Sequence, residues 1–82
     1  MHRRSKDPIF AQILECCKDG ARITRIVHDS NMNFRSIRPY MTVLAKNGLI
    51  EIVAESPTIY RTTKRGLQAL SHLNAIREMI SK

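Results

Sequence analysis

Hydrophobic residues recur at helical spacing through the first half of the chain. The first run begins after Asp7-Pro8, a pair suited to a helix start because the carboxylate caps amide groups and proline fits the first helical position. Its apolar stripe ends before Lys18-Asp19-Gly20, where glycine suits the left-handed conformation that closes many helices. A second, short helix is expected next, with Ile23, Ile26 and Val27 on one face.

A third helix is predicted from residue 34 to about residue 47. Asn33 is placed to cap its start, and Asn47-Gly48 ends it. Pro39 removes one main-chain hydrogen bond, and we expect it to loosen the early turns without ending the helix. At about 100° per residue one narrow arc holds the predicted core seam, which consists of Phe34, Ile37, Met41 and Leu44.

After Gly48 the hydrophobic period changes from helical to alternating. In residues 50–55, Ile, Ile and Ala alternate with Glu, Val and Glu, and residues 58–63 are rich in strand-forming types. Glu55-Ser56-Pro57 is typical of a turn between them. The pattern predicts a two-stranded hairpin that needs helices beneath it, and hence a mainly α protein with a small β-hairpin, an α+β fold.

The last predicted helix carries more apolar surface than one small core needs. Thr63 can cap it, and it runs from Lys64 to about Ser81. Leu67 and Leu70 are expected to complete the core. The apolar residues beyond them predict a homodimer interface made of Leu73, Ile76, Met79 and Ile80. The alternative is a helix that curls back over the first one and buries them within one chain.

The charge of the chain indicates the class of its binding partner. The chain has 82 residues, enough for one modest core, and is divided into a basic arm of residues 1–6 and one domain of residues 7–82. Fourteen Lys and Arg against seven Asp and Glu give a formal net charge of +7. A polyanion is the natural partner of so basic a small protein, and a merely soluble basic protein is the alternative.

Several classes of site find no support in the sequence. Cys16 and Cys17 are the only cysteines and are adjacent, so they predict reduced core residues and not a zinc site or a disulfide framework. There is no glycine-rich phosphate loop and no nucleophile and base in a motif, so we expect neither an enzyme, nor a cofactor, nor a small-molecule ligand. No apolar run approaches the roughly 20 residues of a membrane span, which favours a cytoplasmic, nucleoid-associated protein.

Two stretches resemble a known family. The segment NFRSIRPYMTVLAKNGLIE, residues 33–51, looks like a recognition helix that runs into a first wing strand, and Tyr60, Thr63 and Gly66 match the Tyr-x-x-Thr-x-x-Gly pattern that leaves the second wing strand. Over about residues 7 to 80 the chain resembles winged helix-turn-helix proteins. It is similar in particular to small archaeal winged-helix DNA-binding proteins and predicted transcription regulators, many of which dimerise through the C-terminal helix.

The resemblance implies double-stranded DNA binding, with helix 34–47 in the major groove of the target. Arg35 and Ser36 are predicted to contact base edges, and Thr42 a thymine methyl. The remaining predicted contacts go mainly to phosphates and complete the DNA-binding set with Arg22, Thr24, Arg25, Asn33, Arg38, Lys46, Arg61 and Lys64. The wing tip, with Glu55, Ser56 and Pro57, departs from the usual basic pattern, so its contact with DNA is in doubt.

Three functions remain open on the sequence alone. A transcription regulator that reads a specific site is the first. A chromosomal protein that coats any duplex by backbone charge is the second. A winged helix used for protein contact is the third, since Pro39, Tyr40 and Val43 also lie on the outer side of the third helix.

Overall fold

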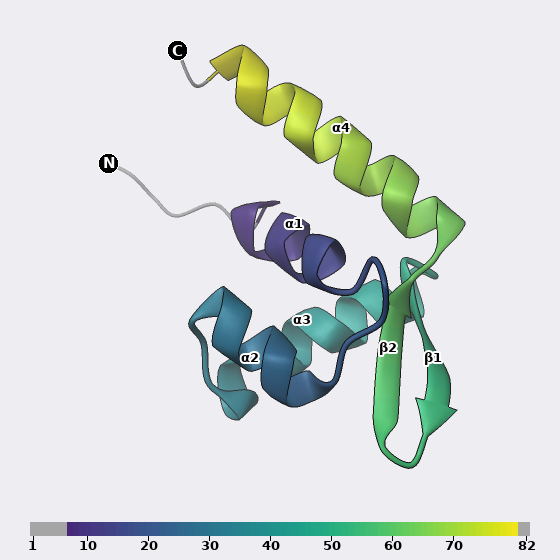
Figure 1. Cartoon of the computed structure of the whole chain (residues 1–82). Helices are drawn as coiled ribbons and strands as arrows, with labels where there is room; N and C mark the ends of the chain where they lie inside the picture. Colours follow the sequence, from purple (N-terminus) through teal and green to yellow (C-terminus); the bar gives the residue numbers. More distant parts are fainter. Residues whose placement is uncertain (1–6, 81–82) are drawn as a thin grey trace.

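The structure, a computed structural model, describes residues 7–80. Four helices and one antiparallel hairpin follow in the predicted order (Figure 1). The predicted arm of residues 1–6 lies outside the described residues. The elements are α1 (Asp7–Cys16), α2 (Ile23–Ser30), α3 (Phe34–Lys46), β1 (Ile50–Glu55), β2 (Thr58–Thr62) and α4 (Lys64–Ile80).

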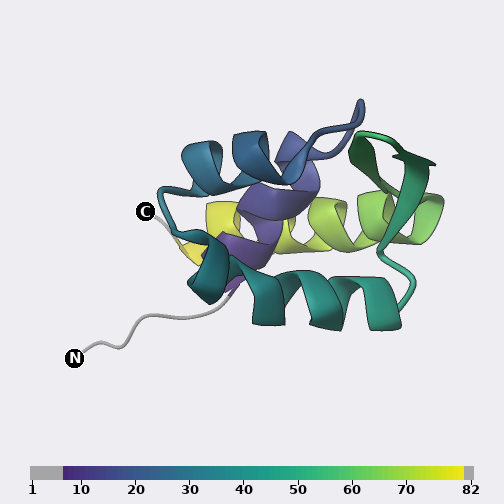
Figure 2. The ribbon, with the colours of Figure 1, turned by 90° about the horizontal axis from the view of Figure 1, so that it is seen from below.

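Helix α1 is the centre of the molecule. It lies between α4 on one side and the α2–α3 pair on the other, and the hairpin stands at the end where α3 finishes and α4 begins (Figures 1 and 2). The side chains with essentially no exposed surface come from α1, the residue after it, α2 and α3, and are Ile13, Leu14, Cys17, Ile26, Ile37 and Leu44. The three predicted helical stripes therefore meet in one core.

Two predicted helix caps are confirmed. The side-chain oxygen of Asn33 accepts a hydrogen bond from the Ser36 amide at 2.8 Å, which satisfies one of the unpaired amides at the start of α3. The Thr63 hydroxyl oxygen accepts from the Gly66 amide at 3.0 Å at the start of α4. The same hydroxyl donates to the Gly48 carbonyl at 2.6 Å, so it also ties α4 to the turn after α3.

Hydrogen bonds join the hairpin to the helices. The main chains of Ala21 and Tyr60 exchange two hydrogen bonds, each of 2.9 Å, so the α1–α2 connection pairs with β2. At the end of β2, the Thr62 amide donates to the Cys17 carbonyl at 3.0 Å. The buried Thr62 hydroxyl donates to the Leu14 carbonyl at 2.7 Å. The hairpin thus has a fixed position relative to α1, which an isolated two-stranded hairpin would lack.

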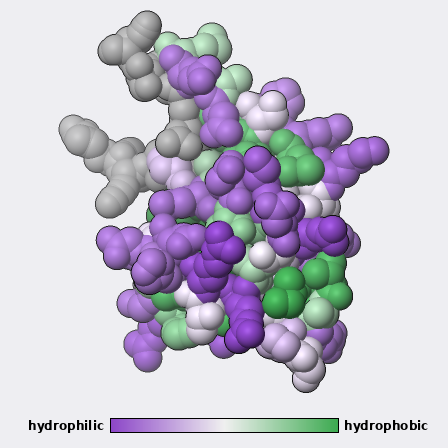
Figure 3. Space-filling view, viewed as in Figure 1, coloured by the Kyte–Doolittle hydropathy of each residue, from purple (hydrophilic) through white to green (hydrophobic). Residues whose placement is uncertain are grey.

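The strict alternation predicted for β1 is wrong beyond its first residue. Ile50 is buried opposite Thr62, but the register shifts between Ile52 and Ala54, and Ile52 is 51% exposed. The bulge follows Ile52, so it changes the facing of the residues after it and does not explain the exposure of Ile52 itself. Val53 is exposed as well, and apolar surface gathers over the hairpin in Figure 3.

Two predicted core residues lie at the surface. Phe34 is 46% exposed because it is the first residue of α3, one turn before the buried Ile37, and the core does not extend beyond that turn. Leu67 is 42% exposed, so among the leucines expected to complete the core only Leu70 is buried. In both cases the helical period is right, but the extent of the neighbouring elements decides burial.

Candidate nucleic-acid interface

The side of α3 that faces away from the core is cationic. Ile37, Met41 and Leu44 point inward and are buried. The opposite side and its flanks expose all the predicted contact residues of this helix, which are Arg35, Ser36, Arg38, Thr42 and Lys46. No Asp or Glu occurs anywhere in the helix. In Figure 2, α3 lies along the lower edge of the molecule, and no other described helix or strand covers its lower side.

The cations of α3 have no acidic partner among the described residues. Among the side chains that the structure describes, Lys18 and Arg25 pair with acidic residues and His28 lies beside Asp29, and none of these contacts engages a residue of α3. An unpaired arginine keeps all its donors for an external acceptor such as a phosphate or a base edge. The exposed face of α3 is therefore ready to bind an anion without first breaking an internal pair.

The start of α2 adds a second group of predicted contacts. Arg22 precedes the helix and forms no side-chain cap, so the first amides of α2 remain available to an external anion. Arg22, Thr24 and Arg25 are exposed and, with Ile59 of the hairpin, line a hollow of about 330 Å³. The structure therefore brings the predicted contacts of α2 together beside β2.

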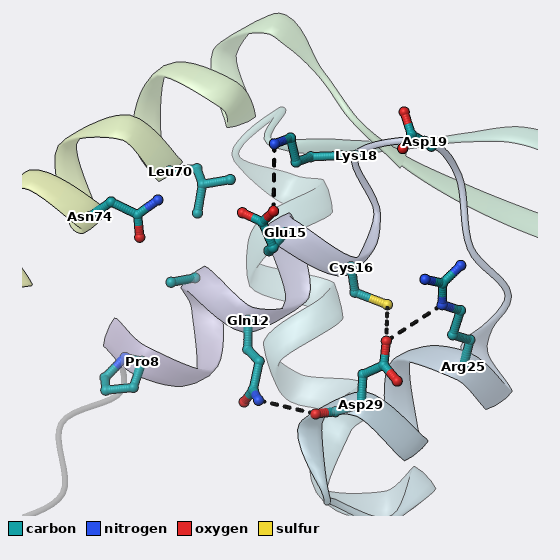
Figure 4. A pocket seen from close by; sticks show the side chains of 11 residues that line it. Pro8, Gln12, Glu15, Cys16, Lys18, Asp19, Arg25, Asp29, Leu70 and Asn74 are labelled. Carbon is teal, nitrogen blue, oxygen red and sulfur yellow. Dashed lines mark hydrogen bonds and ion pairs between the residues drawn. The ribbon is translucent and has the colours of Figure 1, made fainter.

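Arg25 also takes part in a polar network between α1 and α2. Its Nε atom lies 3.4 Å from Asp29 Oδ2, and Gln12 donates to the Asp29 carbonyl at 3.0 Å (Figure 4). The neighbouring His28 ring lies 3.3 Å from Asp29 Oδ1. Hydrogen bonds from His28, then Cys16 and Arg25, lower the pKa of Asp29, so this carboxylate stays charged and holds Arg25. The i,i+4 spacing of Arg25 and Asp29 could have indicated their pair, whereas the contacts of Gln12 and Cys16 depend on the packing of α1 against α2.

The polar network borders a groove of about 680 Å³ between α1, α2 and α4 (Figure 4). Its acidic lining residues are Glu15, Asp19 and Asp29, which are three of the seven acidic residues of the chain. Both of its cations are paired, since Lys18 lies 3.5 Å from Glu15 and Arg25 lies beside Asp29. Helix α3 contributes no residue to this groove. The carboxylates of this groove and the unpaired cations of α3 thus occupy different surfaces.

The two cysteines are thiols, and both pKa values are raised. Burial is the main reason that the pKa of Cys16 rises to about 11, and a hydrogen bond from its Sγ to Asp29 at 3.3 Å adds to the effect. Burial and the neighbouring Cys16 raise the pKa of Cys17 to about 12. Both are protonated at neutral pH, which suits packing and disfavours nucleophilic chemistry. Cys17 is fully buried, whereas Cys16 is only partly buried.

The hairpin offers few cations. Arg61 is exposed on β2 directly opposite Glu51, so its charge is partly offset by its cross-strand neighbour. Lys64 is exposed at the first position of α4. Glu55 lies beside the turn at the tip and is exposed. The base of the hairpin can therefore approach an anion more readily than its tip can.

An apolar hollow lies on one shoulder of α3. It has a volume of about 280 Å³ and is lined by Phe10, Pro39, Tyr40 and Val43. The rings of Phe10 and Tyr40 pack edge to face, with centroids 5.2 Å apart and an interplanar angle of 71°. This contact joins α3 to α1 and shows which shoulder of α3 faces the body of the protein.

The end of α4 exposes apolar side chains. Leu73 is partly buried, whereas Ile76 is 51% exposed and Met79 is 79% exposed. The side chain of Ile80 lies outside the described residues. No described helix is long and apolar enough to cross a membrane. In residues 7–80, no group of His, Cys, Asp and Glu side chains has the arrangement of a metal site.

Comparison with known proteins identifies the family to which this fold belongs. A family model described as winged helix-turn-helix matches residues 3–81. The chain belongs to the winged helix-turn-helix family. Within that family's terms, α3 is the recognition helix and the hairpin formed by β1 and β2 is the wing. The comparison with curated proteins gave no match.

A solved structure has the same architecture. The crystal structure of Sso10a-2, a DNA-binding protein from Sulfolobus solfataricus, superimposes with a TM-score of 0.85. The two chains are 26% identical, and the match covers 93% of this chain and 81% of that one. The predicted fold and the predicted resemblance to archaeal winged-helix proteins are therefore confirmed.

Proposed function

We propose that this winged helix-turn-helix protein binds double-stranded DNA and places α3 in the major groove. The observation that carries the proposal is the exposed face of α3, whose unpaired cations contrast with the paired charges of the groove between α1, α2 and α4. The major groove admits one helix and displays acceptors on its base edges between two rows of phosphates. Similarity to a protein described as DNA-binding supports the same function.

The contacts divide by their position on α3. Arg35 and Ser36 lie in the first turn, the part of a recognition helix that reaches base edges, and Thr42 offers a methyl group to thymine. Arg38 and Lys46 are assigned to phosphates. The Asn33 side-chain oxygen is engaged in the helix cap, so only its amide nitrogen is assigned to the DNA backbone.

Residues outside α3 are assigned to the phosphates of the DNA backbone on either side of the major groove. Arg22 and Thr24 lie at the uncapped start of α2, where amides and side chains together suit a phosphate. Arg25 can join them only by sharing its guanidinium with Asp29. Arg61 and Lys64 at the base of the wing are assigned to the neighbouring phosphates. These contacts position the protein and carry no sequence information.

The finer form of this proposal is a transcription regulator that reads a defined site through Arg35 and Ser36. A chromosome-coating protein in the cytoplasm is the alternative, and it would use the same cations without base readout. Protein contact through the winged helix is favoured by one observation, the apolar hollow lined by Phe10, Pro39, Tyr40 and Val43.

Homodimerisation through α4 is a further part of the proposal. Ile76 and Met79 expose apolar surface at the end of the helix, and burial against a second copy would remove it from water. A two-fold dimer would hold two recognition helices at a fixed spacing, so that each could enter the major groove about one helical turn from the other.

Fluorescence anisotropy with a labelled mixed-sequence duplex tests DNA binding. If about four phosphates are neutralised, raising the salt from about 50 to about 200 mM should weaken binding about a hundredfold, because counterions are released on binding. Absence of binding to any duplex at the lower salt would contradict the proposal and favour protein contact.

A further inference from the structure

Asp29 lies near the end of α2, beside an arginine that the proposed function assigns to the DNA backbone. Its Oδ2 atom lies 3.4 Å from Arg25 Nε (Figure 4). The pair itself stabilises the helix little, because both side chains are partly exposed and the cation precedes the carboxylate by four residues, the less favourable order. A carboxylate in the last turn of a helix also opposes the helix dipole. The stability of α2 therefore does not account for Asp29.

Helix α1 holds the Asp29 carboxylate in place. The Cys16 thiol donates to the same Oδ2 atom at 3.3 Å. Gln12 donates to the main-chain carbonyl of Asp29 at 3.0 Å, so α1 contacts both the side chain and the main chain of this residue. The other carboxylate oxygen, Oδ1, lies 3.3 Å from the exposed ring of His28. The oxygen that faces Arg25 is therefore attached to two helices.

Asp29 engages only the inner nitrogen of Arg25. A guanidinium group has five donor hydrogens, of which Nε carries one and the two terminal nitrogens carry the others. In Figure 4 the terminal nitrogens point away from Asp29. Arg25 also lines the hollow at the uncapped start of α2, together with Arg22 and Thr24. The pair thus restricts the side chain of Arg25 and leaves its terminal donors available at that hollow.

We propose that Asp29 is a positioning residue, which holds Arg25 by its Nε atom so that the terminal nitrogens can bind a phosphate at the start of α2. The inference rests on the proposed DNA binding and adds a residue that does not itself contact DNA. Ordering a long side chain on binding costs free energy, and a side chain that is already held in the bound orientation avoids much of that cost. A carboxylate can therefore favour binding to DNA, although its charge alone would oppose it.

Two substitutions of Asp29 separate its position from its charge. Asp29→Asn and Asp29→Ala both remove one negative charge, but only asparagine keeps a side-chain oxygen that can accept the Nε hydrogen. In anisotropy titrations with a mixed-sequence duplex at low salt, Asp29→Ala should bind about fivefold more weakly than Asp29→Asn, because Arg25 must then be ordered on binding. When Arg25→Ala is also present, the two variants should bind equally.

Glu15 provides the matched control pair. It lies 3.5 Å from Lys18, to which no DNA contact is assigned, so Glu15→Gln and Glu15→Ala should bind the duplex equally. Thermal melting should show that every variant is folded, as expected where the side chains are exposed.

Three results would count against this role. Equal binding by Asp29→Asn and Asp29→Ala would overturn the inference while DNA binding stands. A difference that persists in the presence of Arg25→Ala would overturn it as well, because the effect would then come from the contact between α1 and α2. No binding by the unmodified protein would instead contradict the proposed function on which the inference rests.

Discussion

Gly66 stands where α4 passes closest to the turn after α3. A Cβ atom at this position would collide with the carbonyl oxygen of Leu49 and would lie 2.6 Å from Cγ2 of Thr62. The Thr63 hydroxyl binds the Gly66 amide and the Gly48 carbonyl, so the helix cannot easily move away. The spacing of Thr63 and Gly66 in the family pattern thus corresponds to a cap followed by a close backbone contact.

We predict that Gly66→Ala lowers the free energy of unfolding by about 3 kcal/mol, because the backbone of α4 must shift. Gly48→Ala is the matched control. Gly48 has a φ of +72°, and its added Cβ would meet nothing nearer than Arg65 Cδ at 3.9 Å. Its cost should therefore be only the conformational one of about 1 kcal/mol. Urea denaturation of both variants checks this order, and an equal loss would contradict the close-contact explanation.

At the scale of elements, the helical and alternating periods were sufficient to predict all six elements and their order. The caps by Asn33 and Thr63 were also predictable, because capping depends on residues within three positions of one another. The exposure of Phe34 and Leu67 was not predictable, because it depends on where the neighbouring elements end. The pairing of Ala21 with Tyr60 likewise arises only when the hairpin packs on the helices. The pair of Arg25 and Asp29 has the i,i+4 spacing of a single helix, so the sequence could have indicated it.

The two ends of α3 are expected to contribute differently to DNA binding. We predict that Arg35→Ala weakens binding to selected sites more than to random duplexes, by about tenfold for a lost base contact. Lys46→Ala should weaken both classes alike, because phosphate contacts carry no sequence information. Selection from random duplexes followed by anisotropy titration provides the comparison. Equal losses at all sequences for both variants would favour the coating protein over the regulator.

At the scale of the whole molecule, three surfaces differ in their charge. The recognition helix carries cations and no carboxylate, the groove between α1, α2 and α4 carries paired charges, and the end of α4 carries exposed Ile76 and Met79. A molecule arranged in this way can bind DNA on one surface and a second copy on another without competition between the two.

The proposed homodimer predicts a sedimentation result. The unmodified protein should sediment as a dimer, and Ile76→Glu should give a folded monomer with weaker DNA binding, because a buried carboxylate opposes the interface. Ser71→Glu is the matched control, since it adds the same charge at an exposed position about 140° away around α4 and should leave the dimer intact. A protein that is already monomeric at high concentration would rule out this interface.

The central claim is that duplex DNA is bound by the outer face of α3, and a nuclear magnetic resonance titration tests it most directly. A ¹⁵N-labelled sample of this 82-residue chain would be titrated with a mixed-sequence duplex at low salt. We predict that the largest amide shifts fall on Arg35, Ser36 and Arg38, with smaller ones at the start of α2. Shifts confined to the groove between α1 and α4, or no shifts at all, would contradict the account.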